Sequence, residues 1–565
     1  MYTNERLNDF TRAIRGKKVA VLGIARTNTP LIEFLCKYGA RITAFDRAGE
    51  TELKSRIEAL KACAVEYRLG PGYLADLKGY DWVFRTPAIR PDLPELNDER
   101  ERGAVVTSEM EMFLELCPCT VFGITGSDGK TTTSTLIYEM LKVQGYNCYL
   151  GGNIGKPLLQ DVGAMSPSDM AVIELSSFQL LSMKKSPNVA VVTNLSPNHL
   201  DVHTSYAEYV GAKKNIFAHQ SPDDLCVLNY DNEQTRALCG EAPGRLGIFT
   251  RTRGADLEGY ISRLSGGAVT GPINGAAGSA LSGATTGPIN VSTGGATGAA
   301  VDPAANGNAV YTADGEAGLF SALNGRLPHA AAYVSDENLV YYNRDNCDSR
   351  ASRANRDCHG DNIGSGGSGA SPVVRAGDIR IPGDHNIENY LAAVCAVGRY
   401  VGGGNVAAVA RGFNGAEHRI EYVRTLGGVR YYNDAIATSP TRTLACLNTF
   451  RQKIILIAGG KDKNIDYAPL GRHLAENVRL LILCGQTAEK MKNALLGYCR
   501  DRGAPCETQI LECDRLEDAV AAAYNNARAN DVVVMSPAGT SFDRFRDFEE
   551  KGRYYKALVN ALPER

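Results

Sequence analysis

The sequence contains no apolar run of about 18 residues, and residues 1–6 lack the apolar core of a signal peptide. It also lacks an excess of charge of either sign, since 61 basic and 63 acidic residues leave a formal net charge of −2. Without a strong positive field, a chain has little to hold a polyanion. These absences predict a soluble cytoplasmic protein with neither a membrane nor a nucleic acid as partner.

The 15 cysteines do not form the paired spacing of a zinc ribbon or of a disulfide framework. Most stand singly in apparent strands and helices, as Cys36 and Cys484 do, and Cys117-Pro-Cys119 has no second cysteine pair to join it. We therefore expect reduced and mostly buried thiols.

A chain of 565 residues is too long for one hydrophobic core. At roughly 100 to 200 residues a domain, it predicts three or four domains, and a multi-domain chain favours a ligand cleft.

The most informative segment is 119–133, in which Gly123, Gly126 and Gly129 precede Lys130 and Thr131. We expect a buried strand over 121–125, a glycine-rich turn, and an amphipathic helix over 131–141. Backbone N–H groups of such a turn close around phosphate oxygens, the lysine reaches the β/γ end, and the hydroxyl can ligate Mg²⁺. The spacing G-x-x-G-x-x-G-K-T departs from the strict P-loop form, so an ordinary strand-to-helix connection is the alternative.

The first part of the chain predicts a Rossmann-like unit, with a strand over 17–25, a helix over 31–38 and a strand over 41–46 that ends in an acidic residue. After Gly23 the turn lacks the second and third glycines of a dinucleotide fingerprint. A nucleotide held by other contacts and a purely structural unit are equal alternatives here.

Beyond the glycine-rich segment, buried strands over 170–175, 189–194 and 225–229 alternate with helices, which predicts a parallel sheet. The pattern stops after 261, because 265–332 is rich in glycine, alanine, serine and threonine. We expect 265–332 and 345–372 to be loosely ordered, with one strand over 333–342 between them. A partner-binding arm is the alternative reading of these tracts.

The last part predicts a second complete α/β unit. A turn leads into a helix over 379–391, and strands follow over 429–434, 453–458, 480–484 and 532–535.

Polar residues gather where the predicted strands end, and ligands of open α/β sheets bind at that edge. Glu174 ends the strand over 170–175 and is expected to be a second Mg²⁺-directed group, although a lone glutamate there could simply cap a helix. His199 and His203 follow the strand over 189–194 in a chain with 8 histidines, which favours a metal or phosphate role.

Ten blocks in family order resemble the Mur ligases of peptidoglycan synthesis and cover nearly the whole chain outside the two loose tracts. The blocks lie at 123–133, 151–155, 174–179, 198–201, 212–215, 383–386, 417–420, 433–434, 459–463 and 536–543.

The resemblance implies an α/β protein of three domains. A Rossmann-like UDP-substrate-binding domain over 1–112 would precede a central P-loop ATPase with a parallel sheet over 113–416. A Rossmann-like amino-acid-binding domain would occupy 417–565, and a loose insert over about 262–372 would interrupt the central domain.

The implied reaction is ATP-dependent formation of an amide bond. ATP phosphorylates the carboxylate of UDP-N-acetylmuramoyl-L-alanine, and the amine of D-glutamate attacks the acyl phosphate. ATP and Mg²⁺, with two ions, are the implied cofactors, and the protein is expected to be a monomer.

The resemblance also assigns residues. The implied catalytic residues are Lys130, Glu174, His199 and Lys213; the metal ligands are Thr131, Glu174, His199 and a carbamylated Lys213. The implied ATP-binding residues are Gly123, Gly126, Ser127, Asp128, Gly129, Lys130, Thr131, Thr132, Asn386, Asn389, Arg419 and Asp434. The implied substrate-binding residues are Thr27, Asn28, Asp46, Arg47, Asn153, Ser176, Gln179, Thr438, Lys463, Ser541 and Phe548.

Three residues depart from the family pattern. Ile436 stands where some relatives carry a lysine, Ala25 replaces a glycine, and Arg26 adds a charge at the expected uridine site. For Phe548, core packing is an equal reading. Another Mur ligase, a folylpolyglutamate-type ligase and a non-catalytic nucleotide-binding relative remain alternative functions.

Overall fold

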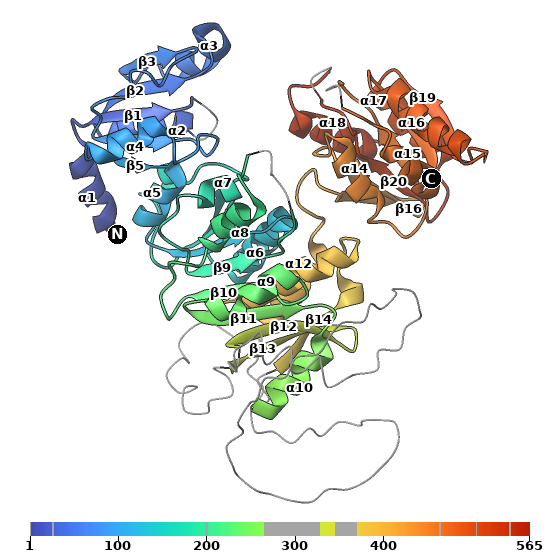
Figure 1. Ribbon diagram of the computed structural model, residues 1–565. Coiled ribbons are helices and arrows are strands. Elements are labelled where there is room, and N and C mark those ends of the chain that lie inside the picture. Colours follow the sequence, from blue (N-terminus) through green and yellow to red (C-terminus); the bar gives the residue numbers. More distant parts are fainter. Residues whose placement is uncertain are drawn as a thin grey trace, which may run out of the picture. The chain divides into compact units, whose positions relative to one another are not determined.

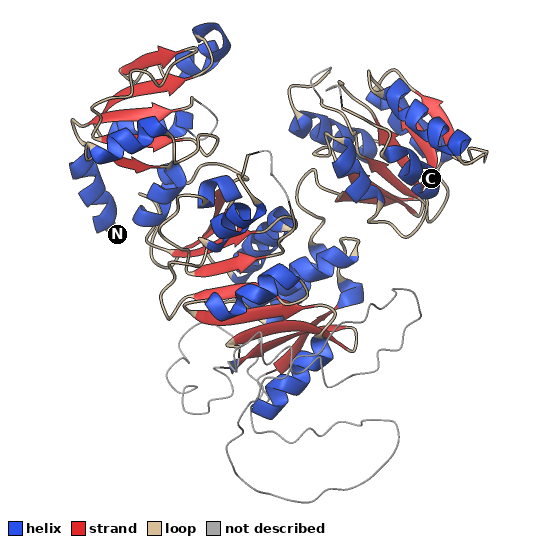
Figure 2. Cartoon of the chain, in the orientation of Figure 1, coloured by secondary structure: helices blue, strands red, loops and turns tan. Residues whose placement is uncertain are grey.

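The computed structural model describes residues 2–24, 28–197, 202–264, 328–344, 370–462, 465–503, 505–541 and 544–564. Residues 1–254 and 328–565 form one compact unit, and 255–327 form a second unit, of which the structure describes only the part of α10 (Gly254–Leu264) that belongs to it. The predicted α/β class is confirmed, because the large unit contains three sheets flanked by helices (Figures 1 and 2).

The first sheet is parallel throughout, with the order β3-β2-β1-β4-β5. Apolar side chains bury β1 and β2 on both faces, as is typical of parallel strands covered by helices. Its strands are β1 (Lys18–Leu22), β2 (Arg41–Asp46), β3 (Val65–Leu69), β4 (Trp82–Arg85) and β5 (Val105–Thr107). Its helices are α1 (Glu5–Ile14), α2 (Asn28–Lys37), α3 (Glu50–Ala59), α4 (Pro94–Glu101) and α5 (Glu109–Leu116).

The second sheet has nine strands in the order β14-β13-β12-β11-β10-β9-β6-β8-β7. Its strands are β6 (Thr120–Thr125), β7 (Cys148–Gly152), β8 (Met170–Glu174), β9 (Val189–Val192), β10 (Leu225–Asn229), β11 (Arg245–Thr250), β12 (Ala330–Ser335), β13 (Asn338–Asn343) and β14 (Ala370–Arg375). The helices of this part of the chain are α6 (Lys130–Gln144), α7 (Ser177–Leu180), α8 (Tyr206–Lys214), α9 (Glu233–Ala237), α10, α12 (Asp384–Val397) and α13 (Gly403–Gly412). Helices α6 and α12 pack against each other and share the core of this sheet.

The predicted parallel sheet is confirmed, since the strands from β6 to β11 pair in parallel. Beyond them, β12 and β13 form an antiparallel hairpin and β14 pairs antiparallel with β13. One prediction for this part of the chain was wrong. The single strand predicted over 333–342 is broken at Asp336 and Glu337, both of which have positive φ and form the hairpin turn.

The boundaries of the loose tracts also need correction. Ala330, Ala331 and Ala332 are buried in β12, although the predicted loose tract included them. Residues 328–344 are ordered within the predicted insert, and β14 begins at Ala370, inside the second tract. The remaining parts of both tracts, 265–327 and 345–369, lie outside the described residues.

The third sheet has the order β15-β16-β20-β17-β18-β19, with only β15 antiparallel to its neighbour. Its strands are β15 (Glu421–Leu426), β16 (Val429–Asn433), β17 (Ile454–Ala458), β18 (Val478–Leu483), β19 (Gln509–Glu512) and β20 (Val532–Met535). Its helices are α14 (Pro440–Leu447), α15 (Leu470–Asn477), α16 (Ala488–Asp501), α17 (Leu516–Asn526) and α18 (Phe548–Asn560).

The cysteines within the described ranges are free thiols, as predicted. Cys117 and Cys119 are buried with their sulfur atoms 3.3 Å apart. In the described part of the chain no helix is both long and apolar enough to cross a membrane.

Candidate nucleotide and acyl-transfer site

The glycine turn between β6 and α6 is shaped by two positions that exclude a side chain. Gly126 has φ +147°, and a Cβ there would lie 1.9 Å from the Thr193 hydroxyl oxygen. Gly129 has φ +80° and is the N-cap of α6; its Cβ would lie 2.4 Å from Asn389 Oδ1. The backbone of this turn therefore needs glycine for conformation and for space.

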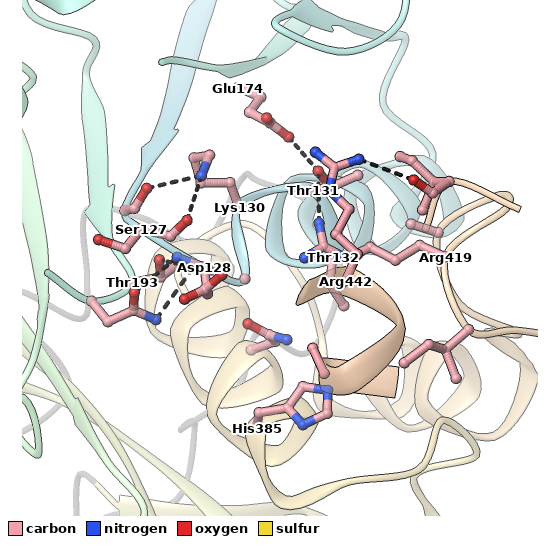
Figure 3. Close-up of a pocket in the computed structure, with 18 of the residues that line it drawn as sticks. Ser127, Asp128, Lys130, Thr131, Thr132, Glu174, Thr193, His385, Arg419 and Arg442 are labelled. Atoms are coloured by element: carbon pink, nitrogen blue, oxygen red, sulfur yellow. Dashed lines mark hydrogen bonds between the residues drawn. The ribbon is translucent and has the colours of Figure 1, made fainter. Parts of the chain in front are cut away.

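Lys130 begins α6 and bends back over the turn. Its Nζ donates to the carbonyl oxygens of Gly126, at 2.9 Å, and Ser127, at 2.8 Å. Burial lowers the pKa of Lys130 below its ordinary value. The lysine and the uncapped N-terminus of a helix of 15 residues form a positive region suited to phosphate (Figure 3).

Gly123 has a different place from the other two glycines. It lies inside β6, paired with Ile173 and Ala190, and a Cβ there would lie 2.5 Å from the Pro187 ring. This glycine therefore allows close packing under the sheet.

Glu174 ends β8 beside the glycine turn, where only 2% of the residue is exposed. Its Oε2 accepts a hydrogen bond from the Thr131 hydroxyl at 2.7 Å, and its Oε1 accepts one from Asn153 Nδ2 at 2.8 Å. The three side chains bring hard oxygen donors to the start of α6, and such donors suit Mg²⁺.

Lys213 and Lys214 are neighbours in α8 but lie in different surroundings. Lys213 is buried, and its Nζ donates to the Thr125 hydroxyl at 3.1 Å and to the carbonyl of Gly126 at 2.8 Å. Burial, reinforced by the charge of Lys130, lowers the pKa of Lys213 to about 7. Lys214 instead forms an ion pair with Glu241.

Asn386 and Asn389 lie on the first turns of α12 and are linked by a hydrogen bond of 3.0 Å. Asn389 also accepts a hydrogen bond from the Thr133 hydroxyl at 3.2 Å, which connects α12 to α6. Both asparagines are buried at the edge of the cavity.

Arg419 is presented by an unusual turn. His418 has φ +65° and Ile420 has φ +42°, so both neighbours of the arginine adopt left-handed backbone conformations. The Ile420 amide donates to Asp434 Oδ1 at 3.2 Å, and burial raises the pKa of Asp434 to about 6. Held this way, Arg419 donates to the Thr131 hydroxyl at 3.4 Å.

These groups line one cavity of about 1020 Å³. The sequence-assigned residues that line it are Gly126, Ser127, Asp128, Gly129, Lys130, Thr131, Thr132, Asn153, Glu174, Ser176, Lys213, Asn386, Asn389, Arg419 and Asp434.

Other assigned residues do not line this cavity. In the third part of the chain these are Thr438, Ser541 and Phe548; the Phe548 ring packs edge-on against His418, and the buried Ser541 hydroxyl has no hydrogen-bond partner among the described residues. Gln179 accepts hydrogen bonds from Ser176 in a capping box at the start of α7.

The assigned residues of the first sheet lie around the β1–α2 turn. Asn28 is buried and donates to the carbonyls of Leu22 and Gly23. Asp46 accepts from the Ile24 amide at 2.7 Å and from the Ala48 amide at 2.9 Å, whereas Arg47 is exposed.

Thr27, His199 and Lys463 lie outside the described residues, as do Ala25 and Arg26. His203 is described and does not line the cavity. It is buried against Phe178, and its Nε2 hydrogen-bonds the Ser177 hydroxyl at 2.9 Å.

Sequence reasoning missed several residues of the cavity. Asn194 accepts from the Asp128 amide through its side chain, at 2.9 Å, and its place two residues after β9 was a usable signal. His385 and Arg442 also line the cavity. Nothing in the local sequence singled out Arg442.

The geometry has the form of a P-loop nucleotide site within an α/β protein. Residues 124–257 match the Mur ligase middle domain, and residues 418–539 match the Mur ligase glutamate ligase domain.

Relatives extend this match to the whole chain. A protein of Acetivibrio thermocellus named UDP-N-acetylmuramoylalanine–D-glutamate ligase is 45% identical over 99% of each chain. One of Ruminiclostridium cellulolyticum with the same name is 41% identical over 99% of this chain and 100% of its own. The solved structure of a UDP-N-acetylmuramate-alanine ligase from Thermotoga maritima covers 96% of this chain and 99% of its own, with 14% identity and a TM-score of 0.49. On the sequence relatives, the chain belongs to the Mur ligase family, whose members are ATP-dependent ligases that form amide bonds.

Proposed function

We propose that this protein adds D-glutamate to UDP-N-acetylmuramoyl-L-alanine, with ATP as the phosphoryl donor, in the synthesis of peptidoglycan precursors. The observation that carries the proposal is the identity of 45% over nearly the full length with a relative of that name. The cavity supports it, since the glycine turn, Lys130 and the acidic Glu174 all line it.

The residues supply most of what phosphoryl transfer to a carboxylate requires. Both the acyl phosphate and the leaving diphosphate gain from positive charge at the cradle, and Lys130 and Arg419 carry that charge. Asn153 would orient the substrate carboxylate, while Asn386 and Asn389 would hold the adenine.

The donor set fits Mg²⁺. Thr131 and Glu174 place a hydroxyl and a carboxylate oxygen 2.7 Å apart, and His199 would complete the proposed set for two ions. Bound there, the metal would neutralise phosphate charge. The described residues, which do not include His199, contain no cluster of three or more His, Cys, Asp or Glu side chains for a metal.

We propose that Lys213 is carbamylated. A pKa of about 7 leaves much of the amine neutral at physiological pH, and only a neutral amine attacks CO₂. The product would be an oxygen ligand in place of a cation.

We propose domains over 1–112, 113–416 and 417–565, each of which contains one of the three sheets. Thr27, Asn28, Asp46 and Arg47 would hold the UDP part of the substrate, with Ser176 and Gln179 nearer its reacting end. Asp434 would meet the nucleotide ribose, while Thr438, Lys463, Ser541 and Phe548 would hold D-glutamate. We further propose a monomer in the cytoplasm, where free thiols persist.

The test is phosphate release by purified protein with ATP, Mg²⁺ and UDP-N-acetylmuramoyl-L-alanine. D-Glutamate should support release, whereas L-alanine, meso-diaminopimelate and L-lysine should not. A preference for one of the other amino acids would replace this proposal with another ligase of the family, and no release with any would indicate a non-catalytic relative.

A further inference from the structure

Arg442 is a cation of the cavity to which the proposed mechanism gives no role. It lies in the first turn of α14, and its side chain lines the same cavity as Lys130 and Arg419 (Figure 3). Its Nη1 donates to the carbonyl oxygen of Ile436 at 3.0 Å. This bond uses one of the five N–H donors of the guanidinium, and the residue is exposed where it lines the cavity.

The position of Arg442 is unfavourable for α14 itself. A positive charge near a helix N-terminus opposes the helix dipole, and the first turn of α14 contains no acidic residue to compensate. Pro440 and the preceding Ser439 already give the helix its start. Helix stability therefore does not explain an arginine here.

The charges of the cavity wall also favour a binding role. Lys130, Arg419 and Arg442 all line the cavity, and the carboxylates of Glu174 and Asp128 line it with them. Three cations thus act on one region of the cavity wall. Such an arrangement is repulsive by itself and becomes favourable when an anion enters.

We propose that Arg442 binds an oxyanion of the reactants, either a carboxylate of the incoming amino acid or a phosphoryl oxygen of ATP. This inference rests on the proposed function and adds a binding residue to it. Ile436, whose carbonyl accepts from the guanidinium, also lines the cavity but has an uncharged side chain. Arg442 therefore supplies the positive charge in this part of the cavity wall, at the start of α14.

The experiment compares the Arg442→Ala, Arg442→Lys and Arg472→Ala variants. Arg472 is an exposed arginine on α15 that pairs with Glu476, and it serves as the matched control. We expect Arg442→Ala to raise KM for one reactant roughly 10- to 100-fold, since charge-assisted hydrogen bonds are lost, with a smaller change in kcat. Arg442→Lys should recover part of the loss, and the control should match the wild type.

The affected reactant identifies the anion. A raised KM for D-glutamate alone indicates a carboxylate, and a raised KM for ATP alone indicates a phosphoryl oxygen. Calorimetric titration of each reactant into the variants provides a readout besides turnover. Values of KM and Kd for both reactants within twofold of the wild type would overturn the inference.

A second variant keeps the test specific. Adding Ile436→Lys to Arg442→Ala returns a cation to the same loop and should lower the raised KM again, while a general disturbance of the fold would not be rescued. Should Arg442→Ala fail to fold, Arg442→Gln keeps a polar side chain that can donate hydrogen bonds and removes its charge. A wild-type protein without amino-acid-dependent phosphate release would refute the proposed function, whereas an active wild type with an equally active Arg442→Ala variant would refute only this inference.

Discussion

The β1–α2 turn and the β6–α6 turn both connect a buried parallel strand to a helix, but different groups fill them. In the first, the Asp46 carboxylate accepts from the Ile24 amide, and Asn28 donates to the carbonyls of Leu22 and Gly23. In the second, Gly126 and Gly129 have no side chains, and the buried Lys213 donates to the carbonyl of Gly126. In the first turn, whose residues 25–27 lie outside the described ranges, side chains take up backbone hydrogen bonds at the strand ends. In the second turn, the absence of side chains at Gly126 and Gly129 leaves the backbone open at the cavity, and this difference favours phosphate binding at the second turn.

The strongest test of this contrast is Lys130→Ala. Without the lysine, charge developing on the transferred phosphoryl group loses a main stabiliser, and kcat should fall roughly 10²- to 10³-fold. Lys142→Ala, at an exposed position of the same helix, is the control. Steady-state phosphate release measures both, and an unchanged rate for Lys130→Ala would remove the lysine from the mechanism.

The Gly126→Ala variant tests the need for an open turn. Its methyl group would overlap the Thr193 hydroxyl, so we expect loss of phosphate release and a free energy of unfolding lower by about 2 kcal/mol or more. Gly145, at the other end of α6, has φ +105° and open space around its Cβ position. Gly145→Ala should lower the free energy of unfolding, measured with urea, by about 1 kcal/mol and leave turnover intact. Equal losses of turnover in the two variants would contradict the role of the glycine turn.

Lys213, which donates to the β6–α6 turn, predicts a pH dependence of the free energy of unfolding. The pKa of Lys213 is lowered to about 7 in the folded protein, whereas an unfolded lysine has a pKa near 10.4. Between these values the unfolded chain binds more protons, so this residue makes stability rise with pH. In CO₂-depleted buffer, Lys213→Met should reduce the rise in unfolding free energy between pH 7 and 9 by roughly 2 kcal/mol. Parallel pH profiles for the two proteins would show that the pKa of Lys213 is not lowered in the folded protein.

The Asp46→Ala variant tests the role of the carboxylate beside the β1–α2 turn. Two amides lose their acceptor, so the free energy of unfolding should fall by about 1–2 kcal/mol. KM for the UDP-linked substrate should rise while KM for ATP stays the same. Asp76→Ala, at an exposed position of the same part of the chain, is the control. A raised KM for ATP would mean that the two turns are not independent.

Continuous apolar runs and strand-end glycines predicted much of this fold. The strands β2, β10 and β20 have the predicted bounds, and the glycine turn lies between the predicted strand and helix. Ala330–Ala332 were missed because alanine is a weak strand former, and here burial between β11 and β13 decides the conformation.

The candidate site likewise contains residues that the sequence predicted and residues that it did not. Lys130 and Thr131 were predicted because they follow β6 within one glycine-rich motif, and Glu174 was predicted because it ends the apolar run of β8. Arg442 could not be predicted, because it reaches the cavity only through the placement of α14. Gln179 lies in the block 174–179 that resembles the family. In the structure its side chain forms the capping box at the start of α7.

The pairing of β13 with β14 has a practical consequence. Tyr342 and Ala370 are register partners, so the chain that leaves one strand returns directly beside it. The entropy of closing such a connection varies only with the logarithm of its length, by about 0.6 kcal/mol for each doubling. This edge of the sheet, away from β6, is accordingly a place where a peptide tag or fluorescent reporter could be spliced in to follow the enzyme without touching its chemistry.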